Sequence, residues 1–399
     1  MKIIIHDYSG HPFQVQLSRV LAQRNYNVLH LTAKFFQTPK GNLMKGKADP
    51  DNFRIEALDI HRPFKKHTFI QRRNQEHYYG TLLAKIVKDE KPDVVISSNT
   101  PLDAQKVLLS TCRDLNIKFI FWLQDVYSLA IDKVLRQKIP ILGSIIGRYY
   151  TFMEKKLLSN STHIIAITED FIPLLLNWGI TKSKIIVIPN WAPINEVPVL
   201  EKDNDWSRRN DLVNKFCFLY SGTLGFKHNP QILLDLARRY VYDAKVRIII
   251  ISEGPALDWL KSEALRLSLE NILFLSFQPF EVLPQILATA DVCISILEPD
   301  AGVYSVPSKV LTYLCAKRPL LLSVPLENLA SKIVEKTNCG LVSNPCDKQS
   351  FLSNADLLLS DERRRSEMGT NAREYAEQNF EINKIVDEFE ILLNQTNRG

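Results

Sequence analysis

Glycine and lysine residues gather at strand-to-helix turns in the second half of the chain. The segment "YSGTLGFKHNP" (220–230) follows a strand-like run and precedes a helix-like run, and it holds Gly222, Gly225, Lys227 and His228. Glycine lets the backbone approach a ligand closely, and lysine supplies positive charge. Backbone N–H groups at a helix N-terminus bind phosphate groups readily. This turn therefore predicts an anion-binding site.

Two further turns of the same half carry similar residues. "ISEGP" (251–255) places Gly254 before a helix-like run, and "EPDAGVYSVPSK" (298–309) ends in Ser308 and Lys309. Lys309 would stand in the first turn of a helix, where the helix dipole repels a cation unless an anion is bound there. Ligands of open parallel sheets bind at the carboxyl ends of the strands. We therefore expect the three turns to form one diphosphate cradle.

Short β-branched runs that alternate with helical patterns must position these turns. They are KIIIHDY, NVLHLTA, FRIEAL, DVVISS, KFIFWLQ, HIIAIT and KIIVIPN in the first half, and FCFLYSG, VRIIIISEG, ILFLSF, DVCISIL, PLLLSV and GLVSNP in the second. Near-continuous apolar strands between helices are typical of a parallel sheet that is covered on both faces. The Pro-rich, charged segment 189–213 interrupts the alternation and predicts a linker. The fold class is therefore α/β, with doubly wound domains at 1–195 and 196–380 and a helical tail at 381–399.

The bulk composition indicates a globular protein. The 399 residues are 45% hydrophobic and 24% charged, and this length suits two or three domains. The N-terminus enters a strand directly, without a signal-peptide pattern, and no apolar run reaches the roughly 18 residues that span a bilayer. The cysteines show no CxxC spacing, so we expect reduced core thiols rather than a disulfide or zinc site. These features predict a cytoplasmic protein.

Positive charge is concentrated in the first half of the chain. Residues 1–195 carry 27 Lys and Arg against 16 Asp and Glu, whereas residues 196–399 carry 23 against 28. The segment "HRPFKKHTFIQRR" (61–73) and the apolar, basic run at 135–158 contribute to this surplus. Both segments could contact an anionic membrane surface, although each could also be an ordinary surface helix or loop. Nucleic acid is not expected, because the acidic second half offers no continuous basic track.

Several common motifs are missing or misplaced. No GxGxxG follows a strand and no GxxxxGK[ST] occurs, which argues against a dinucleotide-binding Rossmann site and a P-loop. The "DND" at 203–205 matches a metal-binding pattern of sugar transferases, but it lies in a charged segment rather than after a buried strand. We therefore expect no metal site there.

Three further residues at strand ends are catalytic candidates. Asp125 follows the run KFIFWLQ, where a carboxylate could orient an acceptor hydroxyl or accept its proton, or could cap the next helix. His11 opens the first helix beside Gly10, and it could contact an acceptor or a sugar phosphate or simply begin the helix. Glu298 ends a strand-like run, and its alternative role is to form the turn.

Taken in order, these features resemble the GT-B glycosyltransferases of family 4 over nearly the whole chain. The segments 11–32, 164–190 and 220–230 follow that family's pattern, as does "FQPFEVLPQILATADVCISIL" (277–297). The most specific likeness is "VPSKVLTYLCAKRPLL" (306–321). Within the family, the chain is similar to bacterial O-antigen and colanic-acid transferases that handle fucose or N-acetylfucosamine.

The resemblance implies two Rossmann-like domains that face a cleft, with a C-terminal helix packed back on the first. The first half would bind the acceptor through Gly10 and His11, and the second would bind a nucleotide sugar. The phosphate cradle would stabilise the charge of the leaving group, so neither a metal ion nor a cofactor is expected. The residues that would bind the donor are Gly222, Thr223, Lys227, Gly254, Ser308 and Lys309 at the diphosphate, Phe277 and Leu283 at the base, and Glu298, Gly302 and Val303 beside the sugar and diphosphate.

The chain departs from the family pattern at four positions. Thr312 stands where relatives often carry a second glutamate, which grips the ribose. Thr223 replaces an arginine after the first glycine, and Gln124 replaces a histidine before Asp125. Lys317 occupies the helix end where glycine is usual, a position that favours the left-handed conformation.

The sequence as a whole predicts a retaining glycosyltransferase. It would move a hexose, fucose-like or N-acetylated, from a nucleoside diphosphate, with UDP preferred, to a lipid-linked glycan. The pathway would be surface polysaccharide assembly (O-antigen, capsule or exopolysaccharide), at the inner face of the cytoplasmic membrane. Two alternatives remain: a GT-B UDP-sugar 2-epimerase, and a non-catalytic subunit that binds nucleotide sugars.

Overall fold

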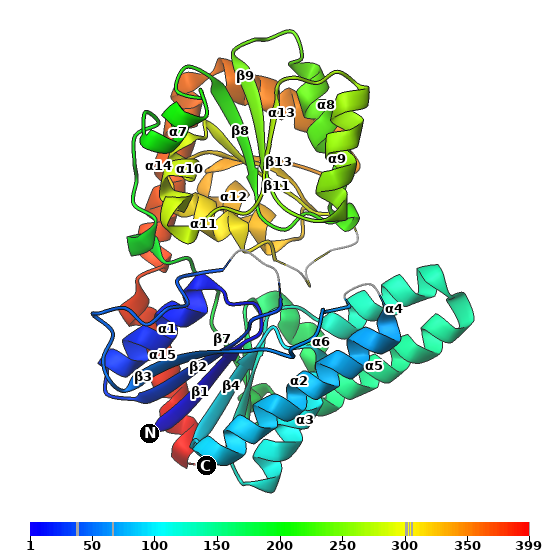
Figure 1. Ribbon diagram of the computed structural model, residues 1–399, viewed down its shortest axis with the longest axis vertical. Helices are drawn as coiled ribbons and strands as arrows, with labels where there is room; N and C mark the ends of the chain where they lie inside the picture. Colours follow the sequence, from blue (N-terminus) through cyan, green and yellow to red (C-terminus); the bar gives the residue numbers. More distant parts are fainter. Residues whose placement is uncertain (37–39, 66–67, 300–301, 303, 305, 399) are drawn as a thin grey trace. The chain divides into compact units, whose positions relative to one another are not determined.

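The structure is a computed structural model that describes residues 1–36, 40–65, 68–299, 302, 304 and 306–398. The side chains of Lys138, Lys227, Asn397 and Arg398 lie outside this description. The chain forms two compact units (Figure 1). Unit 1 comprises Met1–Pro189 and Ile382–Gly399, and unit 2 comprises Asn190–Glu381.

Unit 1 is built on a seven-stranded parallel sheet in the order β3-β2-β1-β4-β5-β6-β7. The order reverses between β1 and β4, which creates the switch point where doubly wound sheets bind ligands. Side chains on both faces of β1, β4 and β5 are buried, so helices cover the sheet on both sides. The strands are β1 (Lys2–Asp7), β2 (Asn27–Ala33), β3 (Phe53–Leu58), β4 (Val94–Ser98), β5 (Lys118–Leu123), β6 (His163–Ala166) and β7 (Ile185–Val187).

The helices of unit 1 include the C-terminal one. Helix α15 packs against α1, and the guanidinium of Arg24 donates to Asp387 and Glu390 of α15. Helices α4 and α5 form a long antiparallel hairpin, drawn in teal in Figure 1. The α-helices are α1 (Pro12–Gln23), α2 (Phe69–Glu90), α3 (Leu102–Asp114), α4 (Tyr127–Lys138), α5 (Pro140–Asn160), α6 (Ile172–Asn177) and α15 (Ile382–Arg398).

Unit 2 is built on a six-stranded parallel sheet in the order β10-β9-β8-β11-β12-β13. Its switch point lies between β8 and β11, whose strands are almost fully buried. The strands are β8 (Phe216–Ser221), β9 (Val246–Ile251), β10 (Ile272–Leu275), β11 (Val292–Ile296), β12 (Leu320–Ser323) and β13 (Gly340–Ser343).

The helices of unit 2 alternate with these strands. They are α7 (Asp205–Arg209), α8 (Gln231–Arg239), α9 (Pro255–Arg266), α10 (Leu283–Thr289), α11 (Lys309–Cys315), α12 (Leu329–Thr337), α13 (Lys348–Ser360) and α14 (Glu362–Asn379), with short 3-10 turns η4 (Phe226–His228) and η5 (Phe280–Val282). Aliphatic residues of the strands and of α8 and α9 form its core.

The linker prediction for 189–213 is wrong over its second part. Trp206 of α7 is buried against unit 2, and Asn204 caps α7 by accepting from the N–H groups of Trp206 and Ser207. Asp203 forms an ion pair with Arg208. The "DND" run therefore serves to begin a helix, because its side chains satisfy the first N–H groups of α7.

The prediction of two doubly wound α/β domains is confirmed, since every strand-like run picked from the sequence contains a strand of the structure. The cysteines are free thiols, and all of them are buried except Cys346. In the part of the chain that the structure describes, no helix has both the length and the apolar character needed to cross a bilayer.

Candidate functional site

In unit 2, the predicted donor residues meet at the carboxyl edge of the sheet. Strands β10, β9, β8 and β11 are parallel neighbours, so the turns that follow them share one edge. Gly222 follows β8, Gly254 precedes α9 after β9, Phe277 follows β10 and Glu298 follows β11. The topology thus brings together residues that lie far apart in the sequence.

The ammonium group of Lys309 occupies the centre of this edge. Its Nζ lies 3.6 Å from the centroid of the Tyr220 ring and 3.5 Å from the carbonyl oxygen of Thr223. Gly222 adopts a φ of 134°, and a Cβ placed there would lie 3.0 Å from Lys309 Cε and 3.1 Å from Nζ. Glycine is therefore required at 222 for two reasons, backbone conformation and space for the lysine.

Tyr313 fixes helix α11 against the end of β8. Its hydroxyl accepts a hydrogen bond from the N–H of Ser221 at 2.9 Å and donates to the Ser221 carbonyl at 3.0 Å. Because Tyr313 lies one turn after Lys309, this pair of bonds sets the position of the lysine relative to the glycine turn. The Tyr220 hydroxyl donates to the Thr223 carbonyl at 2.7 Å and stabilises the same turn.

Lys309 is a cation without a carboxylate partner among the residues that the structure describes. Burial lowers the pKa of its ammonium to about 7. A nearby anion would favour the charged form and raise that pKa again. A half-buried ammonium above a glycine turn is suited to bind a diphosphate and to stabilise its charge as a leaving group.

The other predicted donor residues occupy varied positions. Ser308 is exposed, and its side chain does not cap α11, which begins at Lys309. Gly254 has a φ of 101°, and a Cβ there would meet open space. The Gly302 carbonyl accepts a hydrogen bond of 2.6 Å from Asn328. Lys227 belongs to η4 by its backbone, whereas its side chain, like residue Val303, lies outside the described part of the chain.

In unit 1, the β1 exit carries a buried carboxylate beside His11. The Asp7 side chain accepts hydrogen bonds from the N–H groups of Ser9, at 3.0 Å, and of His11. His11 Nδ1 lies 3.4 Å from Asp7 Oδ1 and 3.1 Å from Asn99 Nδ2. Burial acts to raise the pKa of Asp7, but the charge and hydrogen bonds of His11 prevail and lower it.

Two backbone features shape the same edge of unit 1. Gly10 has a φ of 78°, and a Cβ there would lie 2.9 Å from Leu43 Cδ1. Asn99, which follows β4, adopts a left-handed φ of 54°, and the Tyr127 hydroxyl donates to its carbonyl at 3.1 Å. Asp7 and Ser98 are register partners of β1 and β4, so His11 and Asn99 meet at the switch point.

Asp125 lies half-buried at the β5 exit, but Val126 holds the N-cap position of α4. The first N–H groups of α4 are satisfied from another helix: Glu154 of α5 accepts from the N–H of Tyr127 at 3.1 Å and of Ser128 at 2.9 Å. Glu154 is fully buried, and burial raises its pKa to about 7. It therefore orders the loop that presents Asp125.

Two family models match consecutive parts of the chain. "Glycosyltransferase Family 4" matches residues 13–196, and "Glycosyl transferases group 1" matches residues 202–375. The chain belongs to the family 4 glycosyltransferases. This confirms the resemblance at the level of the family, and the two matched segments fall largely in unit 1 and in unit 2, respectively.

Relatives of this family 4 chain include proteins of glycan synthesis. WcaI of Escherichia coli (strain K12), assigned provisionally as a colanic acid biosynthesis glycosyl transferase, is 23% identical over 254 residues, which is 62% of this chain and 60% of WcaI. The chain thus spans less than two thirds of that relative. Anabaena Alr3699/HepE, solved with UDP and glucose, has a TM-score of 0.73 at 17% identity over 99% of this chain and 100% of that chain. WaaG, a glycosyltransferase involved in lipopolysaccharide biosynthesis, has a TM-score of 0.67 at 16% identity over 96% of this chain and 98% of that chain.

Three further residues that only the family resemblance singled out lie toward this edge of unit 2, whereas Lys317 follows the far end of α11. Phe277 and Leu283 are half-buried at the β10 exit and at the start of α10, and the Phe277 N–H lies 3.3 Å from Glu253 Oε1. Thr312 lies half-buried on α11, and its hydroxyl has no hydrogen-bond partner among the described residues. Lys317 has a left-handed φ of 57°, the conformation for which relatives use glycine.

The sequence reasoning missed five residues that shape the two edges. A weak signal existed for two of them: Asp7 ends a strand directly before "YSGHP", and Asn328 precedes a helix-like run in the manner of an N-cap. The others gave none, because their partners become neighbours only in the fold. These residues are Asp7, Asn99, Glu154, Tyr313 and Asn328.

Proposed function

We propose that the protein is a retaining glycosyltransferase that moves a hexose from a nucleoside diphosphate, with UDP preferred, to a lipid-linked glycan. The sugar would be fucose-like or N-acetylated, and the product would enter surface polysaccharide. The relatives support this choice: HepE was solved with UDP and glucose, WaaG acts in lipopolysaccharide biosynthesis, and WcaI is assigned to colanic acid biosynthesis.

The single observation that carries the proposal is the position of Lys309. A half-buried ammonium over a glycine turn, without a carboxylate partner among the described residues, is unfavourable unless an anion binds there. A nucleoside diphosphate supplies that anion. As the bond from the sugar to the diphosphate breaks, negative charge grows on the departing oxygen, and Lys309 stabilises it. A cluster of three or more metal-binding side chains is absent from the described residues, and the proposal uses no metal ion.

The acceptor side of the proposal rests on unit 1. His11, held by Asp7, and Asp125, presented by the loop that Glu154 orders, are the polar groups at the ends of β1 and β5. Either could orient the attacking hydroxyl or receive its proton. Retention of the anomeric configuration is proposed from the family resemblance alone, and the anomeric signal of the product would report it.

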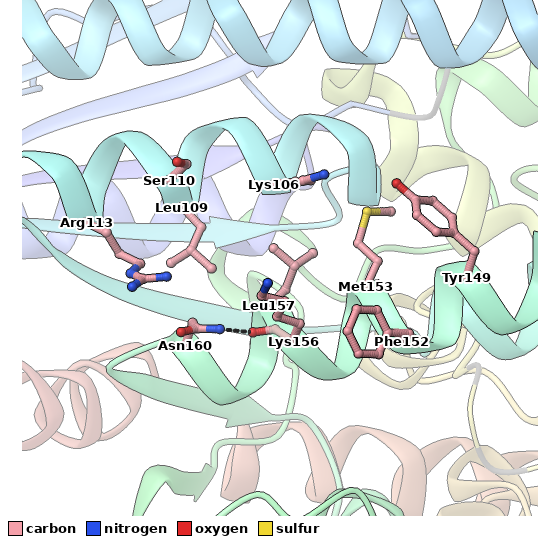
Figure 2. Close-up of a pocket in the computed structure, with 10 residues that line it drawn as sticks. All are labelled: Lys106, Leu109, Ser110, Arg113, Tyr149, Phe152, Met153, Lys156, Leu157 and Asn160. Carbon is pink, nitrogen blue, oxygen red and sulfur yellow. Dashed lines mark hydrogen bonds between the residues drawn. The ribbon is translucent and has the colours of Figure 1, made fainter.

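The membrane side of the proposal rests on a groove between α3 and α5 (Figure 2). Lys106, Arg113 and Lys156 line it, and none of them forms an ion pair within the described part of the chain. No acidic residue lines the groove, whose floor is apolar. The neighbouring Phe152 is 65% exposed. Basic and exposed apolar side chains on one face suit an anionic lipid surface.

The basic segment 61–73 contributes less to this surface than its sequence suggests. Arg72 pairs with Glu76 and Arg73 pairs with Asp103, so two of its cations are neutralised within unit 1. We therefore assign peripheral membrane contact mainly to the α3–α5 groove and to the exposed residues of the α4–α5 hairpin.

The first experiment is to incubate the purified chain with a panel of UDP-, GDP- and TDP-sugars and a lipid-linked acceptor, and to follow sugar transfer by mass spectrometry. Transfer from a UDP-hexose supports the proposal. An epimer formed from a UDP-N-acetylhexosamine without acceptor would instead indicate a 2-epimerase. Binding of a donor without turnover under any condition would indicate a non-catalytic subunit.

A further inference from the structure

Unit 1 contains an apolar pocket of about 360 Å³ between α2, α4 and α5, beside the exits of β1 and β4. One wall is aliphatic and comes from α4, through Ala130, Ile131, Val134 and Leu135. Aromatic rings from other elements, including that of Tyr150, line the opposite side. The volume falls in the range of pockets that bind small molecules.

The arginines that line this pocket form ion pairs, one with a lining glutamate and one with Asp103 behind the lining. Arg72 Nε donates to Glu76 Oε1 at 2.6 Å, and Arg73 Nε donates to Asp103 Oδ1 at 3.1 Å. The second oxygen of Asp103 accepts from the Tyr150 hydroxyl at 2.6 Å. Each guanidinium group that lines the pocket therefore already has a carboxylate partner and is not left unpaired for a phosphate.

Apart from these paired charges and the tyrosine hydroxyls, the polar residues that line the pocket are Ser9 and Asn99, beside the exits of β1 and β4. Ser9 lies in the turn after β1 that also holds Asp7 and His11, and Asn99 contacts His11 from the turn after β4. A saccharide inside the pocket would lose hydrogen bonds to water and find few partners along the α4 wall, which is unfavourable. A hydrocarbon chain loses none and gains from the burial of apolar surface.

The hairpin that supplies the apolar wall also carries exposed apolar residues near its tip. One turn beyond Leu135, the α4–α5 hairpin exposes Ile139, Ile141 and Ile145, and Ile141 is 83% exposed. Exposed apolar residues in such a group mark contact with a lipid or a partner. The same hairpin thus carries both the apolar wall of the pocket and an exposed group of apolar residues.

We propose that this pocket holds the hydrocarbon chain of the lipid-linked acceptor next to its head group. The proposal rests on the proposed function for the identity of the acceptor. It assigns the apolar pocket to the lipid rather than to the sugar, and it leaves the loops at Ser9, His11 and Asn99 for the saccharide end.

The test uses the purified full chain, saturated with UDP so that the donor site is occupied, and geraniol as an uncharged isoprenoid probe. Calorimetry should detect binding of geraniol. The variant Val134→Asp should weaken binding at least tenfold, because it places a charge in the apolar wall. Leu176→Asp on α6 is a matched control: Val134 is 47% exposed and Leu176 is 44% exposed, but only Val134 lines the pocket.

Two outcomes would overturn the inference. One is that both variants lose geraniol affinity equally, or that neither variant loses it, which would mean non-specific binding. The other is displacement of geraniol by free fucose or N-acetylglucosamine, which would make the pocket a sugar site. An unchanged thermal unfolding profile in each variant shows that the fold of unit 1 is retained, since Val134 and Leu176 both lie in that unit. If Val134→Asp removes geraniol binding and the wild-type protein transfers no sugar, the pocket assignment stands and the proposed function fails. If the Val134→Asp enzyme is active with an unchanged KM for the lipid acceptor, the proposed function stands and the pocket assignment fails.

Discussion

The ammonium of Lys309 rests 3.6 Å from the centre of the Tyr220 ring, inside the turn that Gly222 opens. A cation over an aromatic face gains about 2 kcal/mol when it is desolvated, which offsets part of the energy lost on burial. The ring does not neutralise the charge. The site is therefore organised before the donor binds, and the positive charge of Lys309 still lacks an anion to neutralise it.

Replacing this lysine should weaken nucleotide binding. We expect Lys309→Ala to raise the Kd for UDP at least tenfold, because a charge-assisted hydrogen bond contributes roughly 1.5–3 kcal/mol. Lys261→Ala on α9, an exposed lysine of the same unit, is the matched control. Calorimetry measures both variants, and an unchanged Kd for Lys309→Ala would refute the cradle.

Nucleotide affinity should also depend on pH through Lys309. Its pKa in the free protein is lowered to about 7 by burial, and a bound diphosphate raises it. Above pH 7 the free protein must take up a proton at Lys309 to bind, so affinity should fall as pH rises, by up to tenfold per pH unit. Measurement of the UDP Kd between pH 7 and 9 tests this. Lys309→Arg should show a flat profile, because arginine stays protonated; a slope equal to that of the wild type would contradict the assignment.

Much of the fold could be predicted because buried parallel strands have an unmistakable composition. Near-continuous apolar runs such as those of β9 and β10 allow few alternatives, and turn residues mark their ends. The donor edge could be predicted for a related reason. Glycines and lysines that follow successive strands must share one edge, whatever the angles between the helices.

The acceptor edge could not be predicted in the same way. Glu154 lies within "TFMEKKLL", a run that suits a surface helix, and its partners are 26 and 27 residues earlier in the chain. Only the packing of α4 on α5 makes it a cap. The positive charge of the basic segment 61–73 was overestimated from the sequence for the same reason, because the acid that pairs with Arg73 is Asp103, 30 residues later. Hydrogen bonds and ion pairs between different helices leave no pattern in the local sequence.

The Asp7–His11 pair should affect the acceptor and not the donor. Asp7→Asn removes the charge that holds the His11 ring while keeping one oxygen for the backbone N–H groups. We expect kcat/KM for the acceptor to fall by about 10²-fold, within the range of acid–base and positioning effects, with the UDP Kd unchanged. Steady-state kinetics with varied acceptor, beside calorimetry with UDP, separates the two sites. A loss of UDP affinity would mean that the change acts on the whole fold.

Binding of the protein to an anionic membrane should depend on the cations of the α3–α5 groove. We expect the triple variant Lys106→Gln, Arg113→Gln, Lys156→Gln to lose binding to phosphatidylglycerol vesicles, by about fivefold for each cation. The control replaces the exposed lysines Lys45, Lys47 and Lys182 by Gln, which preserves the groove at equal net charge. Sedimentation with vesicles at two salt concentrations measures both. Equal losses would mean that net charge alone drives binding.

Glu154 should make the stability of the protein depend on pH near neutrality. Burial raises its pKa from 4.5 to about 7 in the folded state, so between these values the folded protein binds the proton more tightly than the unfolded chain. The contribution of Glu154 to stability is therefore complete below pH 4.5 and is lost as the pH rises toward 7, by about 3 kcal/mol. Glu154→Gln cannot ionise, so its unfolding free energy should vary less with pH over this range. Glu169→Gln, at an exposed position of the same unit, should follow the wild type. Urea unfolding at pH 5 and pH 7.5 gives the comparison, and parallel behaviour of Glu154→Gln and the wild type would show that Glu154 is ionised at both pH values.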